Sequence, residues 1–189
     1  MITIKKWVLM NFAGWLLGIV LVLTLSVLFD SLHIEGWQFI VGLGMGIGVG
    51  LAQWLALRKQ IPVTFNWIWV TTLGLVSPFL IFDFITHFGN QSIGDYYILI
   101  SVALGGISVG LLQQNLLRTH IANTQNWVIT NIIGWLLAVL AFSAINYTMK
   151  LSIGNLSQFF LNLGLMLAGG PILGYATGIA LKKTTIIKN

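Results

Sequence analysis

Charged residues and cysteines are the two scarce classes in this 189-residue chain. Only 7% of the residues are charged, and there is no cysteine. Soluble domains carry about 25% charged residues, so too few are present here to cover a water-facing surface. The lack of cysteine excludes disulfides, thiolate metal ligands and cysteine nucleophiles. With 57% hydrophobic residues and a mean hydropathy of +0.93, the composition predicts an integral membrane protein.

Six apolar stretches are long enough to cross a bilayer as helices. Each has about 20 residues or more, which spans a hydrocarbon core of roughly 30 Å at 1.5 Å per residue. The stretches are continuous rather than alternating, which favours helices over a β-barrel. The first is too long for a signal peptide and lacks a small-residue cleavage site, so we expect it to be retained. The stretches are approximately Trp7–Phe29, Trp37–Leu57, Trp67–His87, Tyr96–Leu117, Trp127–Tyr147 and Phe159–Leu181.

A two-helix pattern recurs three times, with a period of about 60 residues in the first two copies. Each copy opens on a tryptophan with a glycine seven residues later; these tryptophans are Trp7, Trp67 and Trp127. A second signature, Gly-x3-Gly-x2-Gln/Thr-x4-Arg/Lys, starts at Gly46, Gly106 and Gly170. Self-similarity at a fixed period indicates repeated structural units. We therefore predict a single all-α membrane domain over 1–189, built from three hairpins (approximately 1–60, 61–120 and 121–189) around a pseudo-threefold axis.

Eight of the nine basic residues gather at one side of the predicted spans, whereas Lys150 and the acids lie at or near the other. Cytoplasmic loops of membrane proteins carry an excess of Lys and Arg, so we predict that both termini face the cytoplasm. This asymmetry accounts for the net charge of +5 without a nucleic-acid partner, and it leaves anionic lipid headgroups as secondary ligands of the cations. The cations on the predicted cytoplasmic side are Lys5, Lys6, Arg58, Lys59, Arg118, Lys182, Lys183 and Lys188.

Glycines are concentrated in the second, fourth and sixth spans, where they recur with Gly-x3-Gly spacing. Lipid provides no hydrophobic force between helices, so close backbone approach at small residues holds them together. We expect these three spans to form an inner ring, packed through their glycine faces, with the other three spans outside. A phosphate-binding glycine loop is excluded because it needs a preceding strand, a lysine and a soluble context. Pro78 and Pro171 are expected to kink the third and sixth spans.

The repeat also aligns polar residues near the basic side. Positions four residues after each repeat tryptophan and five residues before each Arg or Lys should lie about 6–8 Å below the interface, at 1.5 Å per residue. These residues are Asn11, Thr71 and Asn131 on the odd-numbered spans and Gln53, Gln113 and Thr177 on the even-numbered ones, with Gln114 beside them. The favoured interpretation is interhelical hydrogen bonding. The alternative is a polar cavity that takes water, a headgroup or a small solute.

Acidic and histidine residues are close together at the opposite side. Asp30 is near His33, Asp83 is four residues before His87 on the same helical face, and Asp95 begins the fourth span. Such a cluster could bind a cation or relay a proton, but the preferred interpretation is an interfacial acid with a partner on its own helix. No metal site is predicted, because the side chains are on separate loops and a site needs three or four ligands. Axial ligation of a pigment is a weaker alternative, because all three histidines lie near span ends.

The segment Gly-Leu-Ala-Gln-Trp-Leu-Ala-Leu-Arg at 50–58, followed by Asn66-Trp67, resembles a loose family of uncharacterised bacterial membrane proteins. These proteins are frequent in cyanobacteria and carry tandem hairpins of this kind with a Trp-rich helix start. The resemblance covers nearly the whole chain, but the later copies depart from it at Gln114, Thr177 and Lys182. It implies a repeated membrane fold and no activity.

Three function classes follow from these patterns. We expect a non-catalytic accessory or assembly subunit that packs with partner membrane proteins or with itself, because no catalytic constellation stands out. The alternative is a small transporter or channel, because transporter folds often arise from repeats with sites between them. A membrane enzyme has no support in the residues. The expected location is a bacterial inner membrane, or a thylakoid membrane in a cyanobacterium. We expect no cofactor, with a pigment or a bound lipid as alternatives.

Overall fold

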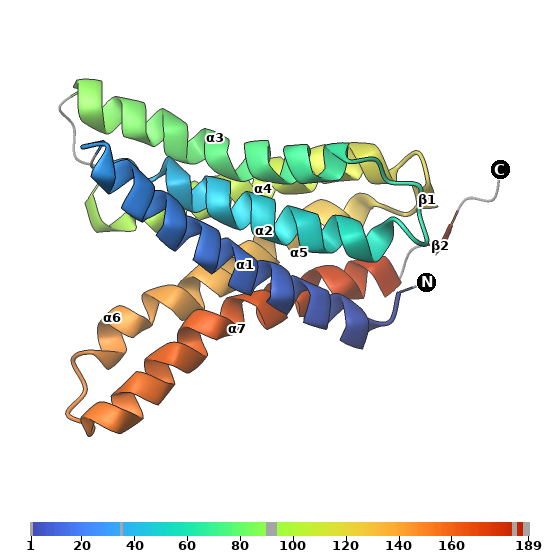
Figure 1. Ribbon diagram of the computed structural model, residues 1–189. Helices are drawn as coiled ribbons and strands as arrows, with labels where there is room; N and C mark the ends of the chain where they lie inside the picture. Colours follow the sequence, from blue (N-terminus) through green and yellow to red (C-terminus); the bar gives the residue numbers. More distant parts are fainter. Residues whose placement is uncertain (1, 35, 90–93, 183–184, 187–189) are drawn as a thin grey trace.

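The computed structural model describes residues 2–34, 36–89, 94–182 and 185–186, and 83% of the protein is helical (Figure 1). Six of the described helical segments are long and apolar enough to cross a membrane, which confirms the predicted multi-pass membrane protein. The elements are α1 (Ile4–Ser31), α2 (Phe39–Leu57), α3 (Asn66–Gly89), η1 (Gly94–Tyr96), α4 (Tyr97–Leu117), β1 (Ile121–Ala122), α5 (Gln125–Ser143), α6 (Ile145–Thr148), α7 (Asn155–Lys182) and β2 (Thr185–Ile186).

Local signals explain where several of these helices start and bend. Thr3 caps α1, with its hydroxyl accepting a hydrogen bond from the Lys6 amide at 3.3 Å. The predicted prolines lie inside α3 and α7. A proline leaves the carbonyl four residues before it without its helical hydrogen bond, so both positions weaken the helix locally. The fifth predicted span is divided into α5 and the single turn α6 at Ala144.

The long helices pack as a closed ring in chain order. Each packs against the helices before and after it, and α7 returns to α1. Among the described residues, extensive packing occurs only between these ring neighbours. The predicted inner ring of α2, α4 and α7 is therefore wrong, because every even-numbered span lies between two odd-numbered ones.

The glycines of α2 show why the inner ring does not form. Residues four apart share a helical face, whereas residues two apart point to nearly opposite sides. A Cβ added at Gly46 would lie 2.6 Å from the Thr72 Cα of α3, and one added at Gly48 would lie 2.4 Å from the Gly18 amide nitrogen of α1. The glycines of α2 thus form two rows, one that admits the backbone of α3 and one that admits that of α1.

Corresponding backbone contacts recur at each junction between successive hairpins, and the second is looser: an added Cβ would lie 2.6 Å from Thr72 Cα, 3.5 Å from Ile132 Cα and 2.8 Å from Phe12 Cα. The glycine that starts the second signature faces the next hairpin at residues 60 positions apart; the pairs are Gly46 with Thr72, Gly106 with Ile132 and Gly170 with Phe12. The third pair joins α7 to α1 and closes the ring. Because the three junctions use corresponding residues, the ring can close with one type of contact.

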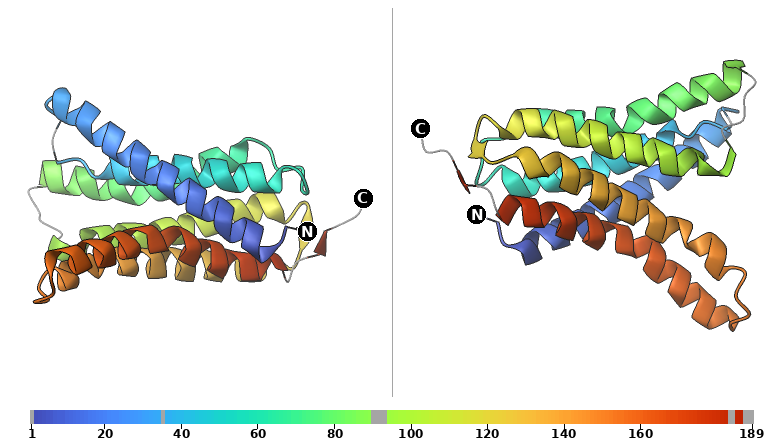
Figure 2. Two further views of the ribbon diagram at one scale, coloured as in Figure 1. Left: turned by 60° about the horizontal axis from the view of Figure 1, so that its bottom comes forward. Right: turned by 180° about the vertical axis from the view of Figure 1, so that it is seen from behind.

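One end of the bundle is tightly gathered, and the other end is splayed. The start of α1 and the end of α7 lie at the gathered end, while the α6–α7 arm diverges from α3 at the far end (Figures 1 and 2). The short strands β1 and β2 pair antiparallel at the gathered end, with Ile121 opposite Ile186. Arg58 and Arg118 cap the C-termini of α2 and α4 at this end, and Lys182 ends α7 there, whereas Lys150 lies between α6 and α7 at the far end.

The close glycine contacts predict a large difference between two alanine substitutions. Gly48→Ala places a methyl group against the α1 backbone, and we expect it to destabilise the protein by about 2–3 kcal/mol. Gly164→Ala is the matched control on α7, because a Cβ there has no neighbour within 4 Å and improves helix propensity by about 1 kcal/mol. Thermal unfolding in detergent measures both. Equal melting temperatures for the two variants would contradict the packing described here.

Candidate functional site

The three repeat tryptophans each donate a hydrogen bond across a hairpin junction. In every case the indole Nε1 donates to the Gln or Thr of the second signature in the neighbouring hairpin. Because the ring is closed, the neighbour of the first hairpin on this side is the third. The bonds join Trp7 to Thr177 Oγ1 at 2.9 Å, Trp67 to Gln53 Oε1 at 3.2 Å and Trp127 to Gln113 Oε1 at 3.1 Å. These contacts tie α1 to α7, α3 to α2 and α5 to α4.

The two glutamines extend this network within their own hairpins. Gln53 Nε2 donates to Asn11 Oδ1 at 2.8 Å, and Gln113 Nε2 donates to Thr71 Oγ1 at the same distance. Gln113 Nε2 also lies 3.1 Å from Gln53 Oε1, so the two amides meet inside the ring. Each glutamine thus bonds to side chains on three other helices.

The odd-helix members are held in place by the backbone. Asn11, Thr71 and Asn131 each donate to the carbonyl of the repeat tryptophan four residues earlier, at 2.9, 2.7 and 3.1 Å respectively. A side-chain bond to a carbonyl one turn back orients the polar group without a partner on another helix. The structure therefore brings together six of the seven residues predicted for the polar layer.

The seventh predicted member, Gln114, does not belong to this layer. Its side chain is partly exposed and donates to the Thr124 carbonyl at 3.1 Å, which links the end of α4 to the start of α5. It follows Gln113 by one residue, and neighbouring residues of a helix point in different directions, about 100° apart.

The layer is sealed from solvent and lipid. Its polar residues and the three tryptophans have exposed fractions of 0–1%. Trp127 lies between the other two indoles, with ring centroids 6.4 Å from Trp7 and 6.0 Å from Trp67 in edge-to-face geometry. Leu57, Leu117 and others pack against this cluster. Hydrogen bonds in such a dry environment hold helices together, whereas a lumen would expose polar atoms.

One acceptor in the layer has no partner in the described part of the chain. Asn131 Oδ1 is buried without a hydrogen bond there, although its counterpart, Asn11 Oδ1, accepts from Gln53. The reason lies in the third hairpin, where Thr177 occupies the position of Gln53. A threonine hydroxyl accepts from Trp7 and donates to the Leu173 carbonyl, and it has no further donor to offer.

At the splayed end, the carboxylate of Asp83 caps a neighbouring helix. Asp83 is 1% exposed and accepts hydrogen bonds from the backbone N–H groups of Gln38 at 3.1 Å and Phe39 at 2.8 Å. Tyr97 on α4 donates its hydroxyl to the same carboxylate at 2.5 Å. The first amides of a helix lack internal partners and favour a negative charge. The expected partner on the same helix is therefore wrong, because Asp83 of α3 binds α2 and α4.

The other predicted acid and histidine residues do not join Asp83 in one cluster. The His87 ring stacks on Trp37 at 4.6 Å, and its Nδ1 lies 2.9 Å from the backbone carbonyl oxygen of Asp83. Asp30 is exposed, and His33 forms the turn after α1 with a positive φ of 57°. Asp95 falls in η1, but its side chain lies outside the described part of the structure. Within the described residues, no group of three such side chains could hold a metal ion.

The predicted topology cations lie at helix ends. Arg58 lies over the Trp54 ring, 4.6 Å from its centroid, at the end of α2. Lys59 follows it in an exposed turn, Arg118 caps α4, and Lys182 ends α7. Positive charge is favourable at helix C-termini. Lys183 lies outside the described residues.

The sequence did not reveal Tyr97 as a partner of Asp83 or Trp37 as a partner of His87. Sequence spacing does reveal pairs on one helix, but Tyr97 is 14 residues from Asp83 and on another helix. The only available signal was an acid within an apolar span, which requires a partner of some kind.

No protein-family model matches this chain, and neither the curated proteins nor the solved structures give a significant match. The resemblance to the cyanobacterial membrane family therefore stays a prediction. Inferences about function depend on the geometry of the chain itself.

The unpaired acceptor predicts unequal costs for two equivalent substitutions. Asn11→Leu leaves Gln53 Nε2 buried without its acceptor, and we expect a loss of about 1–2 kcal/mol in the free energy of unfolding. Asn131→Leu loses only the bond from Nδ2 to the Trp127 carbonyl, which Asn11→Leu matches with the loss of its bond to the Trp7 carbonyl, so its cost should be clearly smaller. Denaturant unfolding in detergent compares them. An equal or larger cost for Asn131→Leu would show that Asn131 has a partner in the membrane.

The helix cap predicts that replacing Asp83 lowers the stability of the protein strongly and that replacing Asp30 does not. Asp83→Ala leaves two backbone amides at the start of α2 unpaired and removes one of the two acceptors of the Tyr97 hydroxyl, so we expect a loss of about 2 kcal/mol in the free energy of unfolding. Asp30→Ala is the control, because this acid is exposed at the end of α1. Thermal unfolding should separate the two variants. A stable Asp83→Ala protein would mean that the cap contributes little.

Proposed function

We propose that this protein is a non-catalytic assembly subunit of a membrane, which packs with partner membrane proteins or with a second copy of itself. The observation that carries the proposal is the sealed polar layer. Its side-chain donors and acceptors bind partners on neighbouring helices or on the backbone of their own helix, and among the described residues of the layer only Asn131 Oδ1 lacks a partner. Side chains committed in this way stabilise a rigid scaffold and leave few groups to bind a substrate.

Transport of a polar solute through the ring is the weaker alternative. A path would need polar side chains facing an open lumen, and the glutamines that would line it are 0–1% exposed and bonded to each other. The repeats also run parallel with two helices each, so they lack the inverted symmetry that many transporters use for alternating access. An enzyme is likewise not proposed, because most of the buried polar groups of the described residues have structural partners.

The proposal includes the symmetry and orientation of the ring. We propose that the three hairpins are copies of one unit around a pseudo-threefold axis. Corresponding contacts at the three junctions support this, as do the three tryptophan bonds. Basic residues at the gathered end support a cytoplasmic location for both termini. The proposed membrane is a bacterial inner membrane, or a thylakoid membrane if the resemblance to the cyanobacterial family holds.

Two measurements on the wild-type protein test this function. Tagged protein purified from its native membrane in a gentle detergent should retain a stoichiometric membrane-protein partner or a second copy, measured as the mass of the intact complex. Purified protein in sealed vesicles should add no permeability to water, glycerol or ions above that of empty vesicles.

The double variant Gln53→Leu with Gln113→Leu separates the structural role from a transport role. We expect a lower melting temperature, because Trp67, Trp127 and Asn11 lose their partners, with unchanged vesicle permeability. Solute flux in the wild type that disappears in this variant would contradict the subunit proposal and favour a channel. A strictly monomeric protein from native membranes would also count against it.

A further inference from the structure

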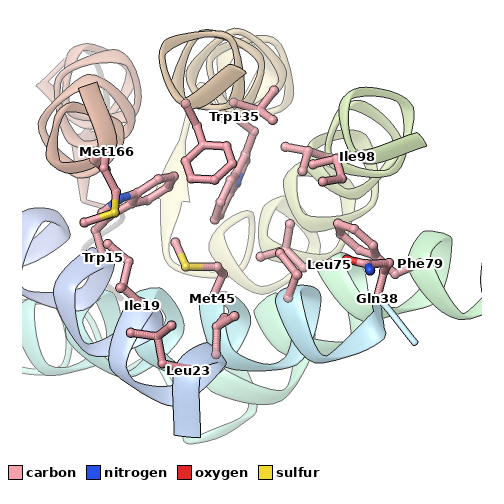
Figure 3. Close-up of a pocket in the computed structure, with 15 residues that line it drawn as sticks. Trp15, Ile19, Leu23, Gln38, Met45, Leu75, Phe79, Ile98, Trp135 and Met166 are labelled. Carbon is pink, nitrogen blue, oxygen red and sulfur yellow. The ribbon is translucent and has the colours of Figure 1, made fainter. Parts of the chain in front are cut away.

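A cavity of about 430 Å³ lies in the splayed half of the bundle, beyond the polar layer (Figure 3). Trp15 and Trp135 bound it at the deep end, with ring centroids 6.0 Å apart, and Met45 and Leu75 form part of its wall. Both tryptophans are eight residues beyond the repeat tryptophan of their own helix, so the cavity starts about 12 Å farther into the bundle at 1.5 Å per residue.

The lining of the cavity is apolar. Among the described residues that line it, Gln38, at the start of α2, is the only one with an amide or charged side chain. The Trp15 indole donates to the Met166 carbonyl at 2.9 Å, so its polar atom is already used. Apolar cavities of about 150 Å³ stay dry and accept molecules such as benzene. A cavity almost three times larger, in the size range of ligand sites, should also exclude water and accept an apolar molecule.

The cavity reaches the lipid-facing surface of the bundle. Leu23 and Phe142 both line it, yet their side chains are 62% and 45% exposed. The glycines of α7 indicate where the ring opens. Gly170 and Gly174 touch the backbone of α1, whereas a Cβ at Gly164 would have no neighbour within 4 Å. The contact between α1 and α7 therefore ends near Gly169, and the two helices diverge beyond it (Figures 1 and 2).

The depth of the cavity matches one leaflet of a bilayer. On α1 the lining residues run from Trp15 to Leu23, which is about 12 Å of helix at 1.5 Å per residue. Half of a hydrocarbon core is roughly 15 Å, and this is the depth that the acyl chains of one leaflet occupy. We propose that the cavity binds the acyl chain of a phospholipid from the leaflet at the splayed end of the bundle.

Physical chemistry favours this occupant over an empty space. A void in an apolar wall loses dispersion contacts, which are individually small and collectively large. A chain that moves sideways from the surrounding leaflet fills the void without any dehydration cost. The two methionines of the wall, Met45 and Met166, have flexible side chains that adapt to a chain of variable shape. The bound chain would support the outer halves of α1 and α7, and this site does not depend on the proposed subunit function.

Photo-crosslinking of the full-length protein in vesicles tests the site. The probe is phosphatidylcholine with a diazirine in the middle of one acyl chain, and mass spectrometry of the digested protein locates the adducts. We expect adducts on Leu75 and Val139, which line the cavity and are 1% and 5% exposed. Lipids that only surround the bundle cannot reach these two side chains.

Two neighbouring positions on α1 provide a matched pair of variants. Ile19→Trp places an indole in the cavity, and we expect loss of the adducts on Leu75 and Val139. Val20→Trp makes the same change on the adjacent residue, which is 57% exposed, and the interior adducts should remain. If Ile19→Trp fails to give a folded, monodisperse protein, Val139→Phe serves as the cavity-filling variant, with Leu75 as the remaining interior reporter.

Two outcomes would overturn the proposal. One is labelling confined to exposed side chains such as Val27, which would mean that the chain does not enter; a dimer mass beside it would indicate a second copy in the cavity. The other is undiminished labelling of Leu75 in the cavity-filling variants, which would mean that the chain reaches it by another route. The labelling pattern in either outcome leaves the subunit function unaffected, because that function is tested separately by the mass of the native complex and by vesicle permeability.

Discussion

The close approach of neighbouring helix backbones at glycine is the constraint on which the rest of this structure depends. In a bilayer the helices gain nothing by hiding apolar side chains from lipid, so their association needs dispersion contacts at short range. Gly48 fits against the backbone of α1 at Gly14 and Gly18, and the glycines facing α3 admit a second backbone on the opposite side. Two such rows on one helix require two neighbours, and a ring of alternating helices satisfies that requirement.

Close packing also determines how the polar layer works. Indole and amide side chains span short distances, so Trp67 reaches Gln53 only because α2 and α3 nearly touch at Gly46 and Gly50. The layer lies at the gathered end, where the ring is tight. At the splayed end the ring is held differently, by an acid on α3 that caps α2 and binds Tyr97 of α4.

Departures from the repeat explain the asymmetry of the ring. Thr177 in place of a glutamine leaves Asn131 Oδ1 without a donor. The Trp15 indole donates to the Met166 carbonyl of α7. The equivalent indole, Trp135, packs against Gly106 of α4, and its Nε1 has no partner among the described residues. The first of these two irregularities follows from one residue that differs between the copies.

The amino-acid sequence by itself determined the six membrane helices and the depth of the polar residues in the bundle. Composition and span length identify each helix separately, and the position of a polar residue along its own helix sets its depth. Asn11 and Gln53 could be placed at one depth for this reason. Only the tertiary structure decided which helices are neighbours, which atom of Gln53 meets which partner, and that Asp83 caps α2. It also decided that a cavity opens where α1 and α7 diverge. These features depend on which helices are neighbours. Glycine spacing allows close packing on several faces of a helix, and only the closure of the whole ring determines which of those faces is used.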